Sequence, residues 1–334
     1  MNRRTSSVAS RLLARRAADL KRHVPGAIDG DAHGVHQARV ASRRLREAVP
    51  VLTAGVRGTK ARKVRGKIRR LTQTLGSVRE LDVTIQLLDE LVAKEALPRP
   101  ALEAVRGRVV LERDARRAVM LRRFEHVNMP KLERRLASVG EVLVATRGES
   151  WRDALGARLL KRSKALAAAM TAAGHMYSPE QLHQVRIAAK KLRYAMELAF
   201  DAGVKSAAAP VRTVKRAQDT LGRLHDLQVL HAHVAAVQAE PSGRSLPDGG
   251  LDVISEALEN ECRHMHARYV ATMPKLAAVV ETTRAVVVPA LAHRARALKM
   301  TKMTLPAPPA RQPQARSVRR APARRVGPAA GGQR

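Results

Sequence analysis

Apolar residues recur at helical spacing along most of the chain. Two stretches, 35–52 and 182–199, show the pattern most clearly, with apolar positions at steps of three or four residues. Such steps place side chains on one face of an α-helix. The faces so predicted comprise Ala38, Ala41, Leu45, Val49 and Leu52 in the first stretch and Val185, Ala188, Leu192, Met196 and Ala199 in the second. Both stretches predict amphipathic helices that pack their apolar face against a core.

The opposite face of both predicted helices is cationic. One row comprises His36, Arg39, Arg43 and Arg46, with Arg44 at its flank; the other comprises His183, Arg186, Lys190 and Arg193, with Lys191 at its flank. Both follow H-x-x-R-x-x-x-[RK]-[RK]-x-R, 147 positions apart. Like charges at this spacing cost a helix about 0.2–0.5 kcal/mol per pair. The two rows therefore predict a bound anion.

The alternative is that each row is a solvated helix face, the usual explanation of one isolated basic stripe. Solvated faces generally mix charges of both signs. Glu47 is the only acid in 35–47, and 181–193 contains none. The repeated spacing therefore favours binding, although each His is as well explained by a hydrogen bond at a helix start.

A second pair of related stretches shows that the whole unit is duplicated. RLTQTLGSVRELDV at 70–83 is echoed by RAQDTLGRLHDLQV at 216–229. Their apolar stripes comprise Val64, Ile68, Leu71, Leu75 and Val78, matched by Val214, Ala217, Leu221 and Leu224. The sequence thus predicts a unit of roughly 145 residues used twice. We expect an all-α fold of two pseudo-twofold-related four-helix bundles that enclose a basic central channel.

Breaks between helices are marked by Pro, Gly and capping residues. Ser178 and Pro179 predict one helix start, and Asp31 occupies the corresponding place in the first copy. Residues 23–34 and 240–250 predict breaks. Residues 303–334 are rich in Pro, Ala and Arg, which predicts a disordered basic tail.

Composition limits the partners. Of 334 residues, 63 are Lys or Arg against 29 Asp or Glu, a formal net charge of +34. Such an excess is typical of proteins that bind a polyanion. The N-terminal residues predict an amphipathic helix rather than a signal peptide, no apolar run is long enough to span a bilayer, and there is one cysteine. We expect a soluble, cytoplasmic protein.

These motifs resemble the CHAD family, the conserved-histidine α-helical domain. The resemblance rests on the two His/Arg rows, with support from LGSVRELD at 75–82 and LGRLHDLQ at 221–228. It covers residues 5–297, with repeat one at about 5–147 and repeat two at about 150–297. It implies two helical bundles with a basic central channel, binding of inorganic polyphosphate, and a location on polyphosphate granules.

The resemblance also assigns site residues. The principal polyphosphate-binding positions are His36, Arg39, Arg43, Arg46, His183, Arg186, Lys190 and Arg193, beside the flanking Arg44 and Lys191. The resemblance extends more weakly to Lys67, Arg70, Arg79 and Arg216. The second copy departs from the first where His225 replaces Arg79 and Gln228 replaces Asp82.

We therefore predict a non-catalytic polyphosphate-binding protein that needs no cofactor or metal. Cys262, His264 and His266 resemble metal ligands in sequence, but only Cys262 and His266 share a helix face. The alternative function is non-specific binding of nucleic acid through charge. Six aromatic residues in 334 offer few platforms for stacked bases. The sequence does not indicate an oligomeric state.

Overall fold

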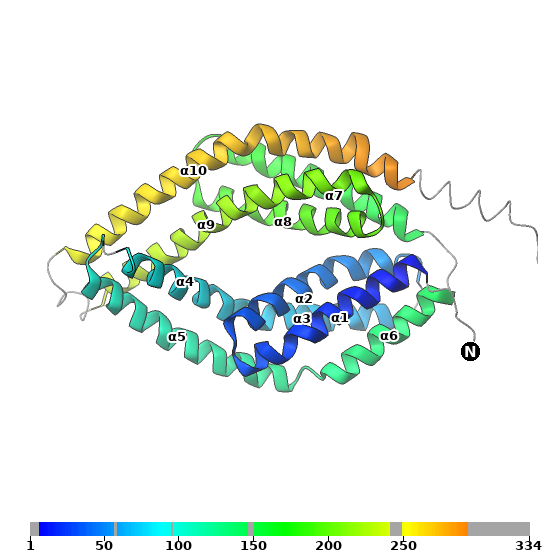
Figure 1. The fold of residues 1–334 in the computed structure, drawn as a ribbon, viewed down its shortest axis with the longest axis horizontal. Coiled ribbons are helices and arrows are strands. Elements are labelled where there is room, and N and C mark those ends of the chain that lie inside the picture. The colour runs from blue at the N-terminus through cyan, green and yellow to red at the C-terminus, as the bar shows by residue number, and fades with distance from the viewer. Residues whose placement is uncertain (1–6, 57–58, 95, 146–149, 241–248, 293–334) are drawn as a thin grey trace, which may run out of the picture. The chain divides into compact units, whose positions relative to one another are not determined.

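The computed structural model describes residues 7–56, 59–94, 96–145, 150–240 and 249–292. By its internal contacts the chain divides into Met1–Arg296 and Ala297–Arg334, and the fold below is that of the first unit. Every regular element in the described residues is helical (Figure 1). The tail predicted at 303–334 and most of the break predicted at 240–250 lie outside the described residues.

The first copy of the duplicated unit supplies six of these helices. They are α1 (Val8–Asp29), α2 (Ala32–Leu52), α3 (Thr59–Thr74), α4 (Gly76–Val92), α5 (Arg99–Glu125) and α6 (Met129–Ala145). The second copy supplies α7 (Ser150–Ala173), α8 (Pro179–Asp201), the short 3₁₀ helix η1 (Lys205–Ala207), α9 (Ala208–Gln238), α10 (Gly250–Thr282) and the π-helical turn η3 (Thr283–Val287). The two His/Arg rows lie on α2 and α8.

The two copies divide their chain differently. The stretches 70–83 and 216–229 each contain a Leu-Gly pair on a predicted helix, called here the Leu-Gly helix. In the first copy this helix is divided into two, because Leu75 separates α3 from α4. In the second copy α9 runs without interruption through Leu221 and Gly222. In the same way, α5 and α6 stand where the second copy has the single long helix α10. The prediction of four helices per copy therefore applies to the second copy, while two of those helices are divided in the first.

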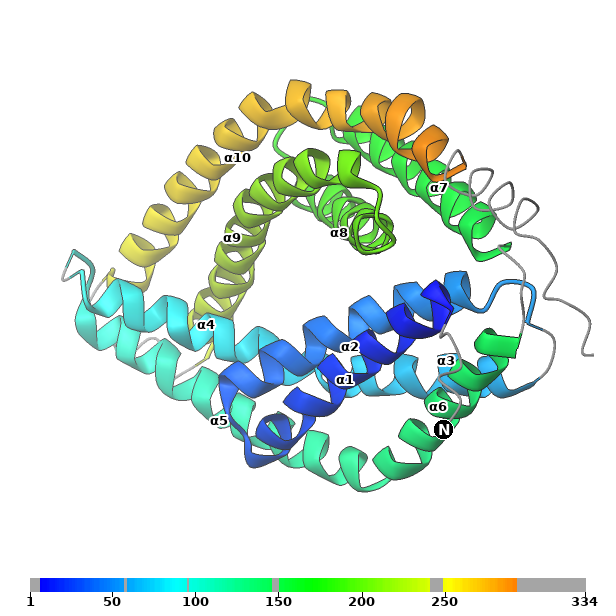
Figure 2. The same ribbon diagram turned by 45° about the vertical axis from the view of Figure 1, so that its right-hand side comes forward.

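Helix contacts define two related four-helix bundles. One consists of α1, α2, α3 and α6; the other is built by α7 and α8 with α9, α10 and η3. The helices α4 and α5 pack against α9 and α10, so the copies also share an interface. Figure 2 shows α2 and α8 on facing sides of the space between the bundles. This arrangement turns the two His/Arg helices toward each other.

The core has the composition that the sequence predicted. All ten apolar positions predicted for the buried faces of α2 and α8 are buried, and so are the nine predicted for α3, α4 and α9. The largest fully buried side chain is Tyr269, and Leu supplies most of the others. Burying each such aliphatic side chain contributes roughly 1.5–3 kcal/mol. Apolar burial therefore holds the cationic faces on the outside of each bundle.

The break between α1 and α2 is shorter than the break predicted at 23–34 and comprises only Gly30 and Asp31. Helix α1 continues through Pro25 to Asp29 and ends at Gly30, whose φ of +85° favours glycine. The Asp31 side chain then accepts hydrogen bonds from the backbone N–H groups of His33, at 3.1 Å, and Gly34, at 2.7 Å. A Cβ on Gly34 would lie 2.5 Å from a backbone atom of Gly26, so glycine permits the close approach of α1 and α2. The second copy begins α8 at Pro179 as predicted, but the Ser178 side chain makes no capping hydrogen bond.

Ion pairs connect the two copies around the space between α2 and α8. In each pair a carboxylate of one copy meets one or two arginines of the other. The pairs are Arg15 and Arg16 with Asp201, Arg44 with Glu197, Arg158 and Arg162 with Glu47, and Arg223 with Glu90. Most of these carboxylates are largely buried, with Glu47, Glu197 and Asp201 each 13% exposed. The pairs therefore position the facing helices relative to each other.

Candidate functional site

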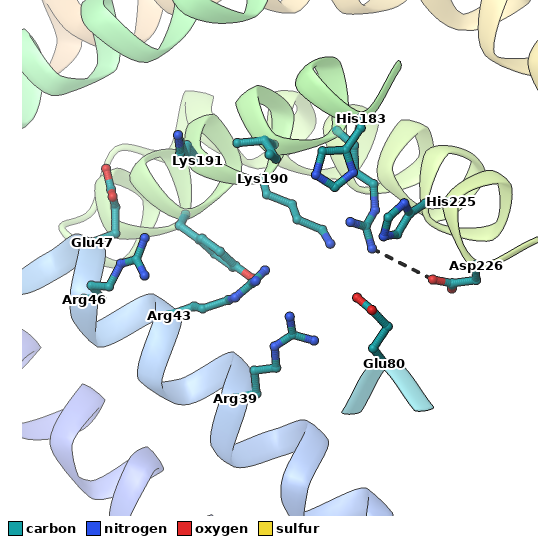
Figure 3. Close-up of a pocket in the computed structure, with 13 residues that line it drawn as sticks. Arg39, Arg43, Arg46, Glu47, Glu80, His183, Lys190, Lys191, His225 and Asp226 are labelled. Carbon is teal, nitrogen blue, oxygen red and sulfur yellow. Dashed lines mark ion pairs between the residues drawn. The ribbon is translucent and has the colours of Figure 1, made fainter. Parts of the chain in front are cut away.

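A cavity of about 380 Å³ lies between α2 and α8. Helices α4 and α9 contribute to its wall (Figure 3). The lining residues are Arg39, Arg43, Arg46 and Glu47 from α2, Glu80 from α4, His183, Arg186, Ile187, Lys190, Lys191 and Tyr194 from α8, and His225 and Asp226 from α9. Both copies therefore contribute to one site.

The cationic rows of the two helices converge on this cavity. In Figure 3, Arg39 and Arg43 project from α2 into the space, and Lys190 projects from α8 toward them. The apolar faces described above determine these directions, because a helix that buries one side must present the other. The two related helices thus turn part of their positive faces to a common space.

The cavity carries an excess of positive charge that its own acids do not balance. Six cationic side chains line it against three carboxylates. Glu47 already forms ion pairs with two arginines of α7, Arg158 at 3.4 Å and Arg162 at 3.2 Å. Asp226 lies 4.0 Å from Arg186, at the limit of an ion pair. In the described part of the chain, no ion pair involves Arg39, Arg43 or Lys190.

Two buried donors in the cavity have no hydrogen-bond partner. They are the Nε atoms of Arg39 and Arg186, which occupy equivalent positions in the two copies. An unsatisfied buried donor costs about 1–3 kcal/mol, and more for a charged group. Native proteins seldom keep such groups except where a ligand or solvent completes them. The orphaned donors thus mark the place where an anion would be stabilised most.

The lowered pKa values of two cations in the cavity agree with its excess of positive charge. Burial, together with Arg186, Arg43 and Arg39, lowers the pKa of Lys190 from 10.5 to about 7. Burial and the neighbouring Arg43 lower the pKa of Arg39 to about 10. Both shifts have the direction expected where cations are desolvated and crowded. An anion in the cavity would oppose these shifts, because its negative charge favours the protonated form of Lys190.

The histidines of the site are neutral near pH 7. Burial and Arg186 lower the pKa of His225 to about 3, and burial and Arg79 lower that of His36 to about 4. The rings of His183 and His225 lie 4.7 Å apart between centroids. A neutral imidazole still offers one N–H donor. These residues can therefore donate a hydrogen bond to an anion but add no charge.

Half of the residues predicted from the sequence line the cavity. They are Arg39, Arg43, Arg46, His183, Arg186, Lys190 and Lys191. The other seven do not: His36, Arg44, Lys67, Arg70, Arg79, Arg193 and Arg216. His36 nevertheless lies close enough for Arg39 and Lys190 to lower its pKa.

Arg44 and Arg193 share a carboxylate rather than facing the cavity. The Nε of Arg44 donates to Glu197 at 2.9 Å, and Nη1 of Arg193 donates to the same carboxylate at 2.7 Å. Arg193 also donates to Gln218 at 2.7 Å, and its guanidinium lies 4.9 Å from the ring centre of Tyr194. Arg44 therefore joins α2 to α8 through Glu197, and Arg193 joins α8 to α9 through Gln218.

The four more weakly assigned positions are dispersed. Arg79 lies near Asp82 and Asp226, whose charges oppose the lowering of its pKa by burial. Lys67 and Arg70 lie on α3, and Lys67 is close to cations of α6, since Arg135 and Lys131 contribute, after burial, to lowering its pKa. Arg216 is exposed on α9. These residues belong to different surroundings, although the sequence placed them in one group.

The sequence reasoning missed several lining residues, notably Glu80, Asp226 and His225. Glu80 and Asp226 are equivalent in the two copies, as are Arg79 and His225, each pair 146 positions apart. This spacing is the signal that could have found them. In the sequence, the replacement of Arg79 by His225 in the second copy looked like a weakened motif. The structure nevertheless places His225 in the cavity and leaves Arg79 outside its lining.

Two further properties concern the part of the chain that the structure describes. Its His, Cys, Asp and Glu side chains form no group of three that could hold a metal ion. Its helices include none that is both long and apolar enough to cross a bilayer.

The fold and the cavity together define a helical protein with an internal duplication and a cationic site between its copies. The chain matches the CHAD domain family over residues 11–235, two thirds of its length, and it belongs to this family. This agrees with the resemblance seen in the two His/Arg rows. A search among curated proteins found no match.

Solved structures agree on the fold. The chain is similar to the crystal structure of the CHAD domain from the plant Ricinus communis, with a TM-score of 0.55 and 20% identity over 84% of this chain and 91% of that chain. PptA from Streptomyces chartreusis also matches, with a TM-score of 0.49 and 15% identity over 80% of this chain and 97% of that chain. At such identity the first structure supports the all-α fold alone.

Proposed function

We propose that this protein binds inorganic polyphosphate in the cavity between α2 and α8 and performs no catalysis there. The observation that carries the proposal is the convergence of Arg39, Arg43, Arg186 and Lys190 on one space without sufficient acids to neutralise them. Polyphosphate binding is also a property of the CHAD family, to which the chain belongs.

The chemistry of the cavity suits a chain of phosphates. Polyphosphate is a flexible line of anions without a planar group, so a binding site needs rows of cations rather than stacking surfaces. Arginine donates to phosphate oxygens in pairs, and lysine acts as a point charge. Tyr194 is the only Phe, Trp or Tyr side chain among the lining residues, and the Arg193 guanidinium lies over its ring. The lining therefore supports phosphate recognition better than recognition of a base.

Binding would draw its free energy from three sources. Cations that repel one another in the free protein would be neutralised, counterions would leave the polyphosphate, and the orphaned Nε donors would gain acceptors. Because the cavity exists before the ligand arrives, little ordering of side chains opposes binding. We therefore expect affinity to fall steeply with salt concentration.

A charge-reversal variant tests the site directly. Replacing Arg39, Arg43, Arg186 and Lys190 with Glu should abolish polyphosphate binding while circular dichroism shows unchanged helicity. The comparison is a chain truncated at Pro306, which loses the basic tail but keeps the cavity and should bind nearly as the parent does. If the quadruple variant binds like the parent and the truncated chain does not, the tail is the binding element and the cavity proposal is wrong.

The alternative partner is nucleic acid, which the net charge of +34 also favours. Competition between polyphosphate and single-stranded RNA of equal charge separates the two functions. We expect polyphosphate to displace RNA from the parent. Displacement only in the opposite direction would make nucleic acid the better ligand and contradict the proposal.

The non-catalytic role is supported by the engagement of two of the three acids that line the cavity. Hydrolysis of polyphosphate would need carboxylates free to hold Mg²⁺. Glu47 is occupied by arginines of α7, and Asp226 faces Arg186. We further propose that binding recruits the protein to cytoplasmic polyphosphate granules. A fluorescent fusion should form foci in cells that contain polyphosphate and spread evenly in cells that lack it.

A further inference from the structure

A second basic cavity lies on the first copy, away from the space between α2 and α8. It measures about 440 Å³ and is formed by α3 and α6. Its lining is Lys60, Lys63, Lys131, Arg134, Arg135 and Ser138, so five of six lining residues are cationic and none is acidic. No residue is shared with the lining of the first cavity.

The cations of this second cavity lack acidic partners. In the described residues no ion pair involves any of the five, and Lys60 donates only to the Ser138 hydroxyl, at 3.1 Å. The nearby acid of α6, Glu133, is bound to Lys21 of α1 at 2.8 Å. Cations elsewhere on the surface are commonly paired, as Arg99 is with Glu103 and Arg106 is with Asp89. The cavity is therefore an uncompensated region.

The sequence of α3 reinforces this charge. Its sixteen residues contain seven Lys or Arg and no acid. Lys67, on the same helix, lies near enough to Arg135 and Lys131 for their charges to add to burial in lowering its pKa. Like charges three and four residues apart oppose helix formation. The helix forms because Val64, Ile68 and Leu71 are fully buried on its other face.

The second copy has no equivalent cavity surface. Lys63 and Lys67 are replaced by Ala209 and Thr213 in α9. Helix α10 carries MPKL at 273–276, as α6 does at 129–132, so Lys275 corresponds to Lys131, while Ala278 and Val279 replace Arg134 and Arg135. Because the fold of the two copies is the same in this region, the scaffold does not require these cations. These cations are therefore explained by a function of the first copy and not by the requirements of the fold.

We propose that the cavity between α3 and α6 is a second binding site for the phosphate groups of polyphosphate, separate from the central one. This inference rests on the proposed function. A long polyphosphate chain engages both sites at once, while short chains occupy them independently. The second site thus adds affinity for long chains through effective concentration.

The position of Arg69 supports a connection between the two sites. Arg69 lies on α3, and its charge contributes, after burial and Arg43, to lowering the pKa of Arg46 at the central cavity. Helix α3 therefore presents cations toward the central cavity through Arg69 and toward α6 through Lys63. A chain of phosphates that leaves the central cavity past Arg46 can therefore continue along this helix.

Tripolyphosphate is the probe that separates the sites, because a compact anion occupies one cavity at a time. Isothermal titration calorimetry of the parent should show two binding sites. One of them should be lost in the α3–α6 variant, which combines Lys63→Glu, Arg134→Glu and Arg135→Glu. The other should be lost in the central variant, in which Arg39, Arg43, Arg186 and Lys190 are replaced with Glu. For long polyphosphate, the slope of log affinity against log salt should decrease by roughly two for the α3–α6 variant, since three cations are removed.

A matched control places the same charge change on the second copy. Arg212, Lys215 and Lys275 are exposed, and their replacement with Glu should leave both tripolyphosphate sites intact. If the α3–α6 variant behaves like this control while the central variant loses binding, the second site does not exist and the proposed function stands. If the central variant also binds like the parent, both proposals fail.

Two other polyanions are controls for the identity of the ligand. Single-stranded RNA of matched charge and vesicles of phosphatidylglycerol can be titrated with the same variants. If the α3–α6 variant loses RNA or vesicle binding but keeps both tripolyphosphate sites, the cavity serves that other partner and the proposal is overturned. Loss of a tripolyphosphate site in the α3–α6 variant alone supports it.

Discussion

The helices α2 and α8 occupy equivalent positions in the two copies but present different electrostatics to the cavity. The first contributes three guanidinium groups, those of Arg39, Arg43 and Arg46. The second places Lys190 where the first has Arg43, and the pKa of Lys190 is lowered to about 7. The backbone and the buried faces are alike, so the difference lies in the ionisable group. Duplication preserved the scaffold and left one cation of the α8 side, Lys190, able to lose its charge near pH 7.

The comparison extends to the helices behind them. Arg79 of the first copy and His225 of the second are equivalent, yet only His225 lines the cavity, as a neutral ring. The first copy is also alone in carrying the basic α3–α6 surface. The first copy therefore holds more permanent charge, and the second is more sensitive to pH. Variants that change one copy at a time test this contrast.

The largest effect should come from removing the cavity charge of one copy. Arg39→Gln with Arg43→Gln on α2, and Arg186→Gln with Lys190→Gln on α8, should each weaken polyphosphate binding at least about 100-fold, since charged hydrogen bonds contribute about 1.5–3 kcal/mol each. Fluorescence anisotropy with labelled polyphosphate measures this. Arg212→Gln with Lys215→Gln, on the exposed face of α9, is the control and should change affinity little. An effect confined to one copy would show that the ligand contacts only one helix.

Removing a carboxylate that joins the copies should affect stability. Glu197→Gln leaves Arg44 and Arg193 without their shared partner and should lower the free energy of unfolding by about 1–3 kcal/mol, because Glu197 is largely buried. Thermal denaturation followed by circular dichroism measures the change. Glu103→Gln breaks an exposed pair within α5 and should cost less than about 0.5 kcal/mol. Equal effects of the two variants would mean that Glu197 does not join the helices as described.

Binding should depend on pH through Lys190. Its pKa is about 7 in the free protein, and a bound anion raises it, so binding above pH 7 takes up a proton. Affinity should fall as pH rises above 7, by up to about tenfold per unit, and should be insensitive to this group below pH 7. Titrations in buffers of different ionisation enthalpy count the proton. Lys190→Arg, which keeps its charge, should remove the pH dependence. If the pH dependence remains in this variant, another group takes up the proton.

The smallest effect should be a gain in stability of the free protein. The pKa of Lys190 when folded, about 7, lies below the unfolded value of 10.5, so protonation of this residue opposes folding. The cost is complete below pH 7 and declines as pH rises from 7 toward 10.5. Lys190→Met should therefore stabilise the free protein by about 1–2 kcal/mol below pH 7, a value reduced from the full shift by relaxation and water. Denaturant unfolding at pH 6 and pH 10 measures it, and no gain at pH 6 would contradict the lowered pKa.

Helix periodicity carried most of the fold prediction. The apolar stripes of α2, α8 and the Leu-Gly helices are all buried, and the duplicated spacing predicted two related bundles. Local capping was less predictable. Asp31 caps α2, but Ser178 makes no capping bond, and α1 continues through Pro25 because a helix can bend around one proline when packing supports it.

The candidate site was only partly visible in the sequence. The row pattern selected Arg39, Arg43, Arg186 and Lys190, since spacing on a helix decides which side chains share a face. It also selected Arg44 and Arg193, which are bound to Glu197 of α8. It could not select Glu80 or Asp226, because these come from α4 and α9 and reach the cavity through packing between helices.

The sequence by itself determined the helices, their buried faces, the duplication and the excess of positive charge. These properties follow from local spacing and composition, which do not depend on distant parts of the chain. Only the tertiary structure decided which cations face an open cavity, which are neutralised by a carboxylate of the other copy, and that the charges of α3 meet those of α6. The physical reason is that the energy of a charge depends on its desolvation and on neighbours within a few ångströms, and those neighbours are brought together by folding from positions more than a hundred residues apart.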